Sequence, residues 1–433
     1  MINNKSKVGI LSLGCARNLV DSESILARLN LKGYPIVDID KADVAVINTC
    51  CFIEEAKKES VDTILDLIDL KKEGRLKKII VYGCLAQRYK DKLRKELPEI
   101  DAFIGALSLN HSLKRFAITP QHYAYLKICE GCINNCSYCI IPKIKQKFNS
   151  LDIECIIKKV EALDKDRICE LNIIGQDITG YGIDLYGTRQ LPELLNKIIK
   201  ETKNIGWIRL LYLYPHSIID ELLDLMKDQP RICKYIDLPI QHINDRILRL
   251  MQRDTTKKDI LRIIDKIRKK IPDAAIRTSI IVGFPTECDA EFKELLKFIE
   301  DVRFERLGAF IYSREEGTAA YNFKDQIPKS IKIERFNTVM SQQQEISQEI
   351  NKKFLNKVMQ VLIDEKENDI YPVRKDATVD MKFSNGVYLG RTQYDAPEVD
   401  GQVFVKSKEE LKPGDFLKVK ITDTQEYDLV GEA

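Results

Sequence analysis

The sequence predicts an α/β protein built from a parallel α/β domain at residues 1–115, a partial (β/α)6 barrel at 116–350 and a small antiparallel β-barrel at 355–433. Apolar strand-like segments alternate with segments of helical periodicity, three times before residue 110 and six times between 123 and 312. Repeated βα units form parallel sheets covered by helices. After residue 355 the pattern changes to short strands separated by Gly, Asn and Pro.

The first domain is predicted from three βα units in sequence. Each apolar segment has the length of a strand, and each following segment carries apolar residues at helical spacing. The expected strands are Lys7–Leu13, Asp43–Thr49 and Lys78–Gly83, and the expected helices are Asp21–Leu31, Glu54–Leu70 and Ala86–Leu97.

The second domain is predicted as an open barrel, because six units in about 200 residues are too few for the closed eight-fold form. The expected strands are Tyr123–Ile128, Glu170–Ile174, Trp207–Leu213, Tyr235–Pro239, Ile276–Val282 and Leu307–Ile311. The expected helices between them include Glu154–Leu163, Pro192–Thr202 and Lys258–Lys270. A polar helix at Ile331–Phe354 is expected to act as a connector.

The tail is predicted to be a small β-barrel with acidic character. Ser384-Asn385-Gly386 is a hairpin signal. The expected strands are Val358–Ile363, Ala377–Phe383, Gly386–Arg391, Gly401–Val405 and Phe416–Thr422. Residues 355–433 hold 11 Lys and Arg against 16 Asp and Glu, a balance of −5, whereas the rest of the chain has a balance of +8. Phosphate binding needs a positive face, so the tail is a poor candidate for gripping nucleic acid.

Composition excludes several classes of protein. The 433 residues are 44% hydrophobic and 31% charged, which is typical of a globular chain. No apolar run approaches the roughly 18 residues of a membrane span, and residues 1–8 lack the apolar core of a signal peptide. We therefore expect a cytoplasmic protein without membrane contact. In a reducing compartment, the 12 cysteines are better explained by metal binding or catalysis than by disulfides.

The densest cysteine cluster follows the first expected strand of the barrel. Cys132, Cys136 and Cys139 form a Cys-x3-Cys-x2-Cys pattern. Three thiolates this close can hold one face of a cubane cluster and leave the fourth iron open to a substrate. Including Cys129, four cysteines could instead bind zinc or a closed cluster, but zinc ribbons usually place a long spacer between two cysteine pairs. The spacing favours the open iron–sulfur cluster.

This pattern, with the aromatic Tyr138 before its last cysteine, resembles the signature of radical S-adenosylmethionine enzymes. The resemblance implies a partial (β/α)6 barrel and a [4Fe–4S] cluster whose open iron binds S-adenosylmethionine, the source of a hydrogen-abstracting radical. We expect cofactor contacts from Tyr138, from Gln176 after the second barrel strand and from Glu287 after Gly283-Phe284-Pro285, because strand-end polar residues at this end of a barrel are often functional. A structural role is an equal alternative for each. No catalytic residue is assigned beyond the cluster ligands.

Three further cysteines end the three strands of the first domain. Cys15, Cys50 and Cys84 are separated by 35 and 34 residues, about one βαβ unit each. The carboxyl ends of neighbouring parallel strands meet at one edge of a sheet, so three thiolates at equivalent positions predict a shared metal site. For a lone cysteine, burial would be the simpler interpretation. We interpret the neighbouring Cys51 as structural.

The segments around these cysteines resemble the N-terminal domain of methylthiotransferases. The resemblance rests on Gly14–Glu23, Asn48–Cys50 and Gly83–Tyr89. It implies that Cys15, Cys50 and Cys84 hold a second [4Fe–4S] cluster that carries the sulfur to be inserted. It also implies a TRAM-like β-barrel as the tail. The chain departs from the family at Cys51, where glycine is usual, and at Lys145-Gln146, where Arg-Gly is usual.

Four stretches resemble the branch of this family that modifies an aspartate of ribosomal protein S12, and they are Gln176–Tyr186, Trp207–Pro215, Tyr312–Thr318 and Gly390–Gly401. This branch implies S12 as partner, free or in the small ribosomal subunit, with an electron donor protein and a sulfur donor. The acidic tail agrees with a basic protein partner, although solubility alone would also explain its charge. The alternatives are a transfer-RNA adenosine methylthiotransferase and a non-catalytic zinc or redox-sensing protein. Transfer RNA is not an expected partner of this chain.

Overall fold

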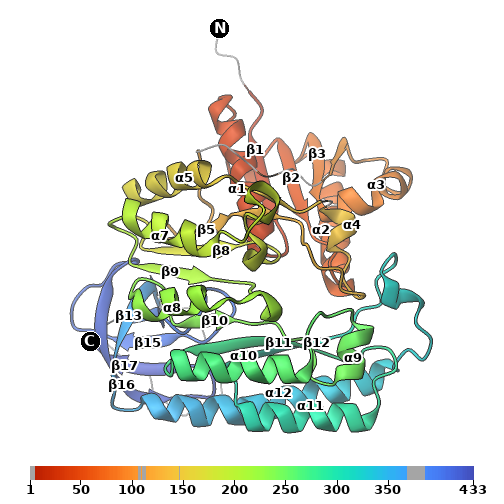
Figure 1. Cartoon of the computed structure of the whole chain (residues 1–433). Helices are drawn as coiled ribbons and strands as arrows, with labels where there is room; N and C mark the ends of the chain where they lie inside the picture. Colours follow the sequence, from red (N-terminus) through yellow and green to blue (C-terminus); the bar gives the residue numbers. More distant parts are fainter. Residues whose placement is uncertain (1–4, 106–108, 110–113, 146, 368–385) are drawn as a thin grey trace.

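The computed structural model describes residues 5–105, 109, 114–145, 147–367 and 386–433, and it confirms the predicted α/β fold class. Figure 1 shows the N-terminal domain at the top, the partial barrel below it and the tail barrel at the left. No helix of the described residues has the length and apolarity needed to cross a membrane.

The N-terminal domain is a parallel sheet of order β1-β2-β3-β4 covered by helices. The expected strands and helices are present, and a short fourth strand was not predicted. The first helix begins at Ala16, five residues before the expected start, because Cys15 is already the extended residue that precedes it. The elements are β1 (Val8–Ser12), α1 (Ala16–Leu31), β2 (Val44–Thr49), α2 (Glu54–Lys72), β3 (Lys78–Gly83), α3 (Cys84–Glu96) and β4 (Ala102–Ile104).

The partial barrel contains the six predicted strands in chain order. Two parallel sheets, β5-β8-β9 and β10-β11-β12, are joined where the amide of Leu213 donates to Asp237 O at 3.0 Å. Alternate residues point in opposite directions. Leu171 and Ile173 therefore pack under the helices, whereas Glu170 and Asn172 face the barrel interior. The strands are β5 (Tyr123–Lys127), β8 (Glu170–Ile174), β9 (Trp207–Leu210), β10 (Tyr235–Asp237), β11 (Ala275–Val282) and β12 (Arg306–Ile311).

Helices and a small hairpin complete this domain. The hairpin pairs β6 (Cys129–Glu130) with β7 (Asn149–Ser150). The last helix is more than the expected connector, because Val339, Ile346 and Ile350 belong to the buried core of the barrel. The helices are α4 (Ile141–Ile144), α5 (Ile153–Lys165), α6 (Ile183–Tyr186), α7 (Leu191–Glu201), α8 (Asp220–Asp228), α9 (Asp245–Leu250), α10 (Lys257–Lys270), α11 (Asp289–Val302) and α12 (Lys329–Asn351).

The tail is a closed five-stranded barrel of order β13-β14-β15-β17-β16 in its described part. Its pairs are antiparallel except β15 with β17, which is parallel. The expected strand Ala377–Phe383 and two residues of the hairpin signal, Ser384 and Asn385, lie outside the described residues. The strands are β13 (Val358–Lys366), β14 (Val387–Thr392), β15 (Val403–Lys406), β16 (Phe416–Thr424) and β17 (Leu429–Glu432).

The tail barrel closes the end of the partial barrel at which the strands begin. Side chains after β14 reach into this end: Arg306 pairs with Asp395, and the Tyr235 hydroxyl donates to Asp400 at 2.6 Å. The N-terminal domain covers the opposite end, where Arg88 pairs with Glu315 at 2.7 Å in the segment that follows β12. The strand ends that carry the predicted chemistry therefore face the N-terminal domain.

Candidate active site

The loop with the first cysteine triad is fixed at the carboxyl end of β5. The Ser137 amide donates to Met251 O at 2.9 Å, and its hydroxyl donates to Leu250 O at 2.7 Å. The Ser137 carbonyl accepts the amide of Ala320 at 2.8 Å. These bonds hold the loop from two directions, and Cys132, Cys136 and Cys139 are all only partly buried. The three thiols therefore remain accessible to a bound group.

Polar side chains support two of these thiols. Asn134 directs its amide N–H and its side-chain amide toward Cys132 Sγ, at 3.4 and 3.5 Å, and also donates to the Asp177 carboxylate at 2.8 Å. Arg253 lies over the ring of Tyr214, 4.3 Å from its centroid, and places Nη1 3.9 Å from Cys136 Sγ. N–H donors and a positive charge stabilise thiolates, which are the form that binds iron.

Cys129 lies in a different environment from the three cysteines of this triad. It is fully buried, its Sγ contacts Asp177 O at 3.7 Å, and a Cβ on Gly175 would lie 2.5 Å from that sulfur. Burial raises the pKa of Cys129 well above its usual value. This environment is that of a packed thiol and supports the three-cysteine interpretation.

The second triad stands where β1, β2 and β3 end. Asn18 in the first turn of α1 ties these ends together. Its amide donates to Leu13 O at 2.9 Å and to Thr49 O at 3.2 Å, and its oxygen lies 4.0 Å from Cys84 Sγ. Asn18 is buried, so the strand ends are held at a fixed separation. The sheet therefore brings the three strand ends, and the cysteines that follow them, to the same edge.

Two glycines show how closely the strand ends approach each other. Gly14 and Gly83 precede Cys15 and Cys84 with φ of +89° and +101°. A Cβ on Gly14 would lie 3.1 Å from Cys50 Sγ, and one on Gly83 would lie 2.4 Å from Asn48 Oδ1. Only glycine combines this backbone conformation with this contact distance. The Gly-Cys pairs are therefore a geometric requirement of the second triad.

Gly83→Ala is expected to destabilise the N-terminal domain by about 3 kcal/mol or more, because a positive φ and an overlap with Asn48 add together. Gly74→Ala is the matched control, since Gly74 has φ of +76° but nothing within 4 Å of its Cβ position. Gly74→Ala should lower the free energy of unfolding only by the strain of a positive φ, about 1 kcal/mol. The thermal midpoint of each variant, followed by circular dichroism, tests this. Equal shifts in the two variants would contradict the close approach.

The surroundings shift the pKa values of the cysteines of the second triad in different directions. Burial raises the pKa of Cys84 to about 12, and repulsion from Cys51, Cys50 and Cys15 adds to it. Burial acts in the same direction on Cys15, but the charge of Arg17 and nearby N–H groups outweigh it and lower its pKa. These shifts are consistent with three thiols near one another, and the shared cluster stays a prediction.

Neither triad is a closed single-ion site as its side chains stand. Among the described residues, no three Cys, His, Asp or Glu side chains gather tightly enough to hold one metal ion. Zinc would need thiolates about 4 Å apart, because its Zn–S bonds are about 2.3 Å long. In a cubane cluster each thiolate binds a different iron. Both sets of three thiols have the donor chemistry of cluster ligands, with N–H groups directed at Cys132 in one set and lowering the pKa of Cys15 in the other.

A buried charge network joins the two domains beside the triads. Lys127 on β5 pairs with Asp21 on α1 and with Glu130 on β6, and Lys145 contacts the same carboxylates at 3.6 and 3.1 Å. Burial opposes ionisation of Glu130, but the two lysines outweigh it and lower its pKa to about 2. The lysine that stands where the family usually has arginine therefore has a defined role, because it bridges the two domains.

The predicted cofactor contacts lie at this end of the barrel in different settings. Gln176 donates to Glu130 at 2.8 Å, and its buried side-chain oxygen has no partner among the described atoms. Tyr138 packs beside Ile247, Met251, Phe284 and Tyr312. Glu287 accepts the amides of Gly283 and Phe284 through one oxygen, and its second, buried oxygen makes no hydrogen bond and lies 3.8 Å from His242 Nε2. Their cofactor roles stay predictions.

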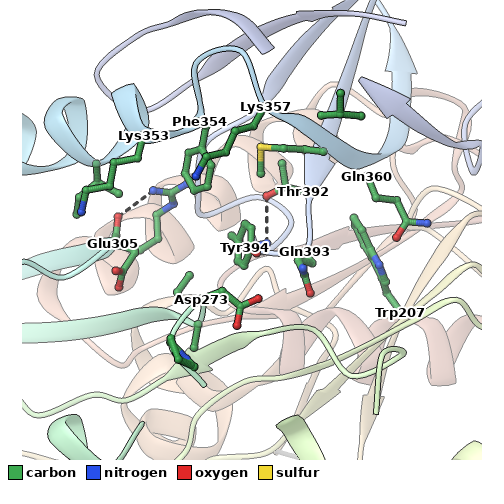
Figure 2. Close-up of a pocket in the computed structure, with 17 residues that line it drawn as sticks. Trp207, Asp273, Glu305, Lys353, Phe354, Lys357, Gln360, Thr392, Gln393 and Tyr394 are labelled. Atoms are coloured by element: carbon green, nitrogen blue, oxygen red, sulfur yellow. Dashed lines mark hydrogen bonds between the residues drawn. The ribbon is translucent and has the colours of Figure 1, made fainter. Parts of the chain in front are cut away.

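A cavity of about 560 Å³ lies elsewhere, at the junction of the partial barrel and the tail barrel (Figure 2). Trp207, Ala275 and Arg306 line it from the beginnings of β9, β11 and β12, and Phe354 and Tyr394 line the tail side. It is therefore at the end of the barrel opposite to both cysteine triads.

Sequence reasoning did not single out Asn18, Asn134, Arg17 or Arg253. Asn18 and Arg17 stand inside the segment Gly14–Glu23, and Asn134 stands between two of the loop cysteines, so each had a local signal. Arg253 follows α9, more than 100 residues from the cysteine that it contacts, and nothing in its local sequence marks it.

Comparison with family models and known proteins agrees with this architecture. The model of the uncharacterized protein family UPF0004 matches residues 7–105, the radical SAM superfamily matches 126–299, and the TRAM domain matches 376–433. Among solved structures, the radical S-adenosylmethionine methyltransferase TsrM from Kitasatospora setae superposes with a TM-score of 0.51 at 11% identity, covering 85% of this chain and 79% of that one. This likeness shows the shared fold.

Curated relatives match the whole chain. The protein of Clostridioides difficile named ribosomal protein uS12 methylthiotransferase RimO is 47% identical, covering 98% of both chains. The protein of Geobacter sulfurreducens with the same name is 41% identical, covering 100% of this chain and 99% of the relative. This chain therefore belongs to the family of ribosomal protein uS12 methylthiotransferases.

Proposed function

We propose that the protein attaches a methylthio group to the β-carbon of an aspartate in ribosomal protein S12. S-adenosylmethionine and one [4Fe–4S] cluster would be held at Cys132, Cys136 and Cys139, and a second cluster at Cys15, Cys50 and Cys84. The observation that carries this proposal is that the strand ends of both domains that carry the cysteine triads face each other, joined by the contacts of Arg17 with Gly175 O and of Arg88 with Glu315. Family membership supports the substrate.

The residues of the chain have separate tasks in this reaction. The bound cluster and S-adenosylmethionine would supply one-electron reduction and a hydrogen-abstracting radical. Asn134 and Arg253 stabilise thiolates in the loop of the first triad. The network of Lys127, Asp21 and Glu130 fixes the N-terminal domain over the barrel. Holding two reacting centres in a fixed relation replaces an encounter in solution and lowers the barrier.

The substrate would approach as a protein rather than as a nucleic acid. The tail has a charge balance of −5 and suits a basic partner, because complementary charge steers association. Ribosomal protein S12, free or in the small ribosomal subunit, is the proposed partner, with an electron donor protein and a sulfur donor in the cytoplasm. Transfer RNA is not proposed as a substrate.

The test is the intact mass of S12 after anaerobic incubation with reconstituted protein, S-adenosylmethionine, reductant and sulfide. A gain of about 46 Da, one sulfur and one CH2 group, on an aspartate-containing peptide is expected. A parallel reaction without S-adenosylmethionine is the control. Modification of S12 in the assembled small subunit but not of free S12 would fix the form of the substrate. Formation of 5′-deoxyadenosine with modification of transfer RNA and of neither form of S12 would overturn the proposed substrate. Neither product, from protein with full iron content, would overturn the proposed function.

A further inference from the structure

We infer that Arg17 binds the side-chain carboxylate of the substrate aspartate and so selects aspartate over its amide analogue. This inference rests on the proposed function. It concerns a residue that lies between the two triads and has no catalytic assignment.

The guanidinium of Arg17 is held at the domain interface by groups of both domains. It extends from the first turn of α1, donates to Gly175 O after β8 at 2.9 Å, and lies over the ring of Tyr212 at 4.6 Å from the centroid. Arg17 follows Cys15 of the second triad by two residues. Its partner Gly175 lies beside the segment that leads into the loop of the first triad, because the Ile128 amide donates to Ile174 O at 3.1 Å. The guanidinium is therefore located where a reacting side chain would meet both centres.

Tyr212 is fixed in an uncommon conformation to form this contact. Its φ is +66°, which is a clear departure for a bulky aromatic residue. The Asp237 carboxylate accepts the Tyr212 amide at 2.8 Å, and Ile178 donates to the Tyr212 carbonyl at 3.2 Å. A conformation that costs energy persists where surrounding bonds determine it, and such residues cluster at functional sites. Here it presents the ring under Arg17.

Arg17 has no carboxylate within ion-pair distance among the described residues, whereas three other cations of this interface have one. Lys127 and Lys145 pair with Asp21 and Glu130, and Arg88 pairs with Glu315. Among the ion pairs of the described residues none includes Arg17, which is only half-buried. A guanidinium has five N–H donors in a planar fork. With Gly175 and Cys15 engaged, donors remain for a carboxylate, the anion that this fork binds in a bidentate manner.

The substrate supplies the matching group. The proposed reaction occurs at the carbon next to the aspartate carboxylate, so that carboxylate must lie within one bond of the reacting atom. A cation that is already paired with a carboxylate of the protein would not be available to bind the substrate carboxylate. Arg17 is therefore suited to orient the β-carbon between the triads while favouring a charged side chain over a neutral one.

The test compares S12 with its Asp→Asn variant as substrates of the reconstituted holoenzyme. The wild-type enzyme should favour the aspartate substrate by about 10- to 100-fold in kcat/KM, the range of a hydrogen-bonded charge. Arg17→Gln should lose most of that advantage, with rates on the two substrates within about 3-fold, because only the aspartate substrate loses a partner. Arg17→Lys should retain part of it, because charge remains and the fork is lost.

Arg314→Gln is the matched control. Arg314 also lies over a tyrosine ring, Tyr321 at 4.5 Å, donates to one carbonyl at 2.9 Å, and is exposed. Its replacement should leave the preference for aspartate unchanged. Formation of 5′-deoxyadenosine without substrate and the iron content report whether each variant keeps its clusters.

An equal loss on both substrates in Arg17→Gln and Arg17→Lys, or an undiminished preference for aspartate, would overturn the inference. Both results would assign Arg17 to the support of the interface alone. Failure of the wild-type enzyme to modify either substrate would instead contradict the proposed function, so the two failures are distinguishable.

Discussion

Cys136→Ala is expected to abolish both cleavage of S-adenosylmethionine and modification of S12, whereas Cys50→Ala should abolish only the modification. Cys136 lies in the loop after β5, and Cys50 lies at the end of β2 in the other domain. The two side chains serve separate triads, so each replacement should remove one cluster and leave the other. Iron should fall from about eight to about four atoms per chain in both variants.

The assay of 5′-deoxyadenosine separates the two triads. Its formation should drop at least about 100-fold in Cys136→Ala, because reductive cleavage requires the cluster that binds the cofactor. It should remain within about 3-fold of wild type in Cys50→Ala. Loss of this product to the same degree in both variants would contradict two independent triads.

Cys129→Ala distinguishes the three-cysteine site from the four-cysteine alternative. Cys129 is fully buried against Gly175 and Asp177, so its removal should reduce stability and leave the iron content of the folded protein unchanged. Cys155→Ala on α5 is the control for cysteine replacement as such. Iron loss as complete in Cys129→Ala as in Cys136→Ala would restore the zinc or closed-cluster interpretation.

The sequence predicts those parts of the fold that depend on patterns within a short segment of the chain. Strand-length apolar runs and helical spacing mark β5 and β8 through β12, and the cysteine at each of three strand ends predicts the second triad because parallel strands share an edge. The start of α1 was placed late because Arg17 and Asn18 are polar and carry no helical apolar stripe. Their polar side chains have structural partners, because Arg17 donates to the barrel at Gly175 O and Asn18 donates to the neighbouring strand ends.

Contacts between distant segments leave no such local mark. In the sequence, Arg209 on β9 and Glu170 on β8 are charged residues in otherwise apolar strands. In the structure they pair with each other at 2.8 Å inside the barrel. Glu170 also pairs with Arg391, which is more than 200 residues away in the tail. The resemblance singled out Gly390–Gly401 as a stretch of the S12-modifying branch, but only the structure shows that it enters the barrel.

Arg391→Ala is expected to destabilise the docking of the tail barrel by about 3 kcal/mol, because it removes one of the two arginines that neutralise the buried Glu170 and the bidentate partner of Asp364. The Arg391 guanidinium bonds both oxygens of Asp364, at 2.7 and 2.8 Å, and pairs with Glu170 at 2.7 Å. It is 3% exposed, and Glu170 is fully buried. Asp364 also bonds His122 at 2.7 Å, so the network spans both barrels.

The single tryptophan of the chain reports this docking directly. Trp207 begins β9, is buried, and contacts Phe416 of the tail barrel with ring centroids 4.9 Å apart. Undocking exposes the indole to water, so its emission should shift to longer wavelength at a lower urea concentration in Arg391→Ala. Arg391→Lys should fall between the two proteins, because the charge stays and the bidentate fork is lost.

Arg262→Ala is the matched control for removal of an ion-paired arginine. Arg262 pairs with Asp259 at 3.2 Å on the surface, with 61% of its side chain exposed. Exposed pairs contribute at most about 1 kcal/mol, so its urea midpoint should stay near that of wild type. A midpoint for Arg391→Ala no lower than that of Arg262→Ala would show that the Arg391 network does not hold the tail in place. The expected difference follows from where the charges lie. Water replaces the partner of the exposed Asp259, whereas water does not reach Glu170, which is left with Arg209 as its one charged partner among the described residues.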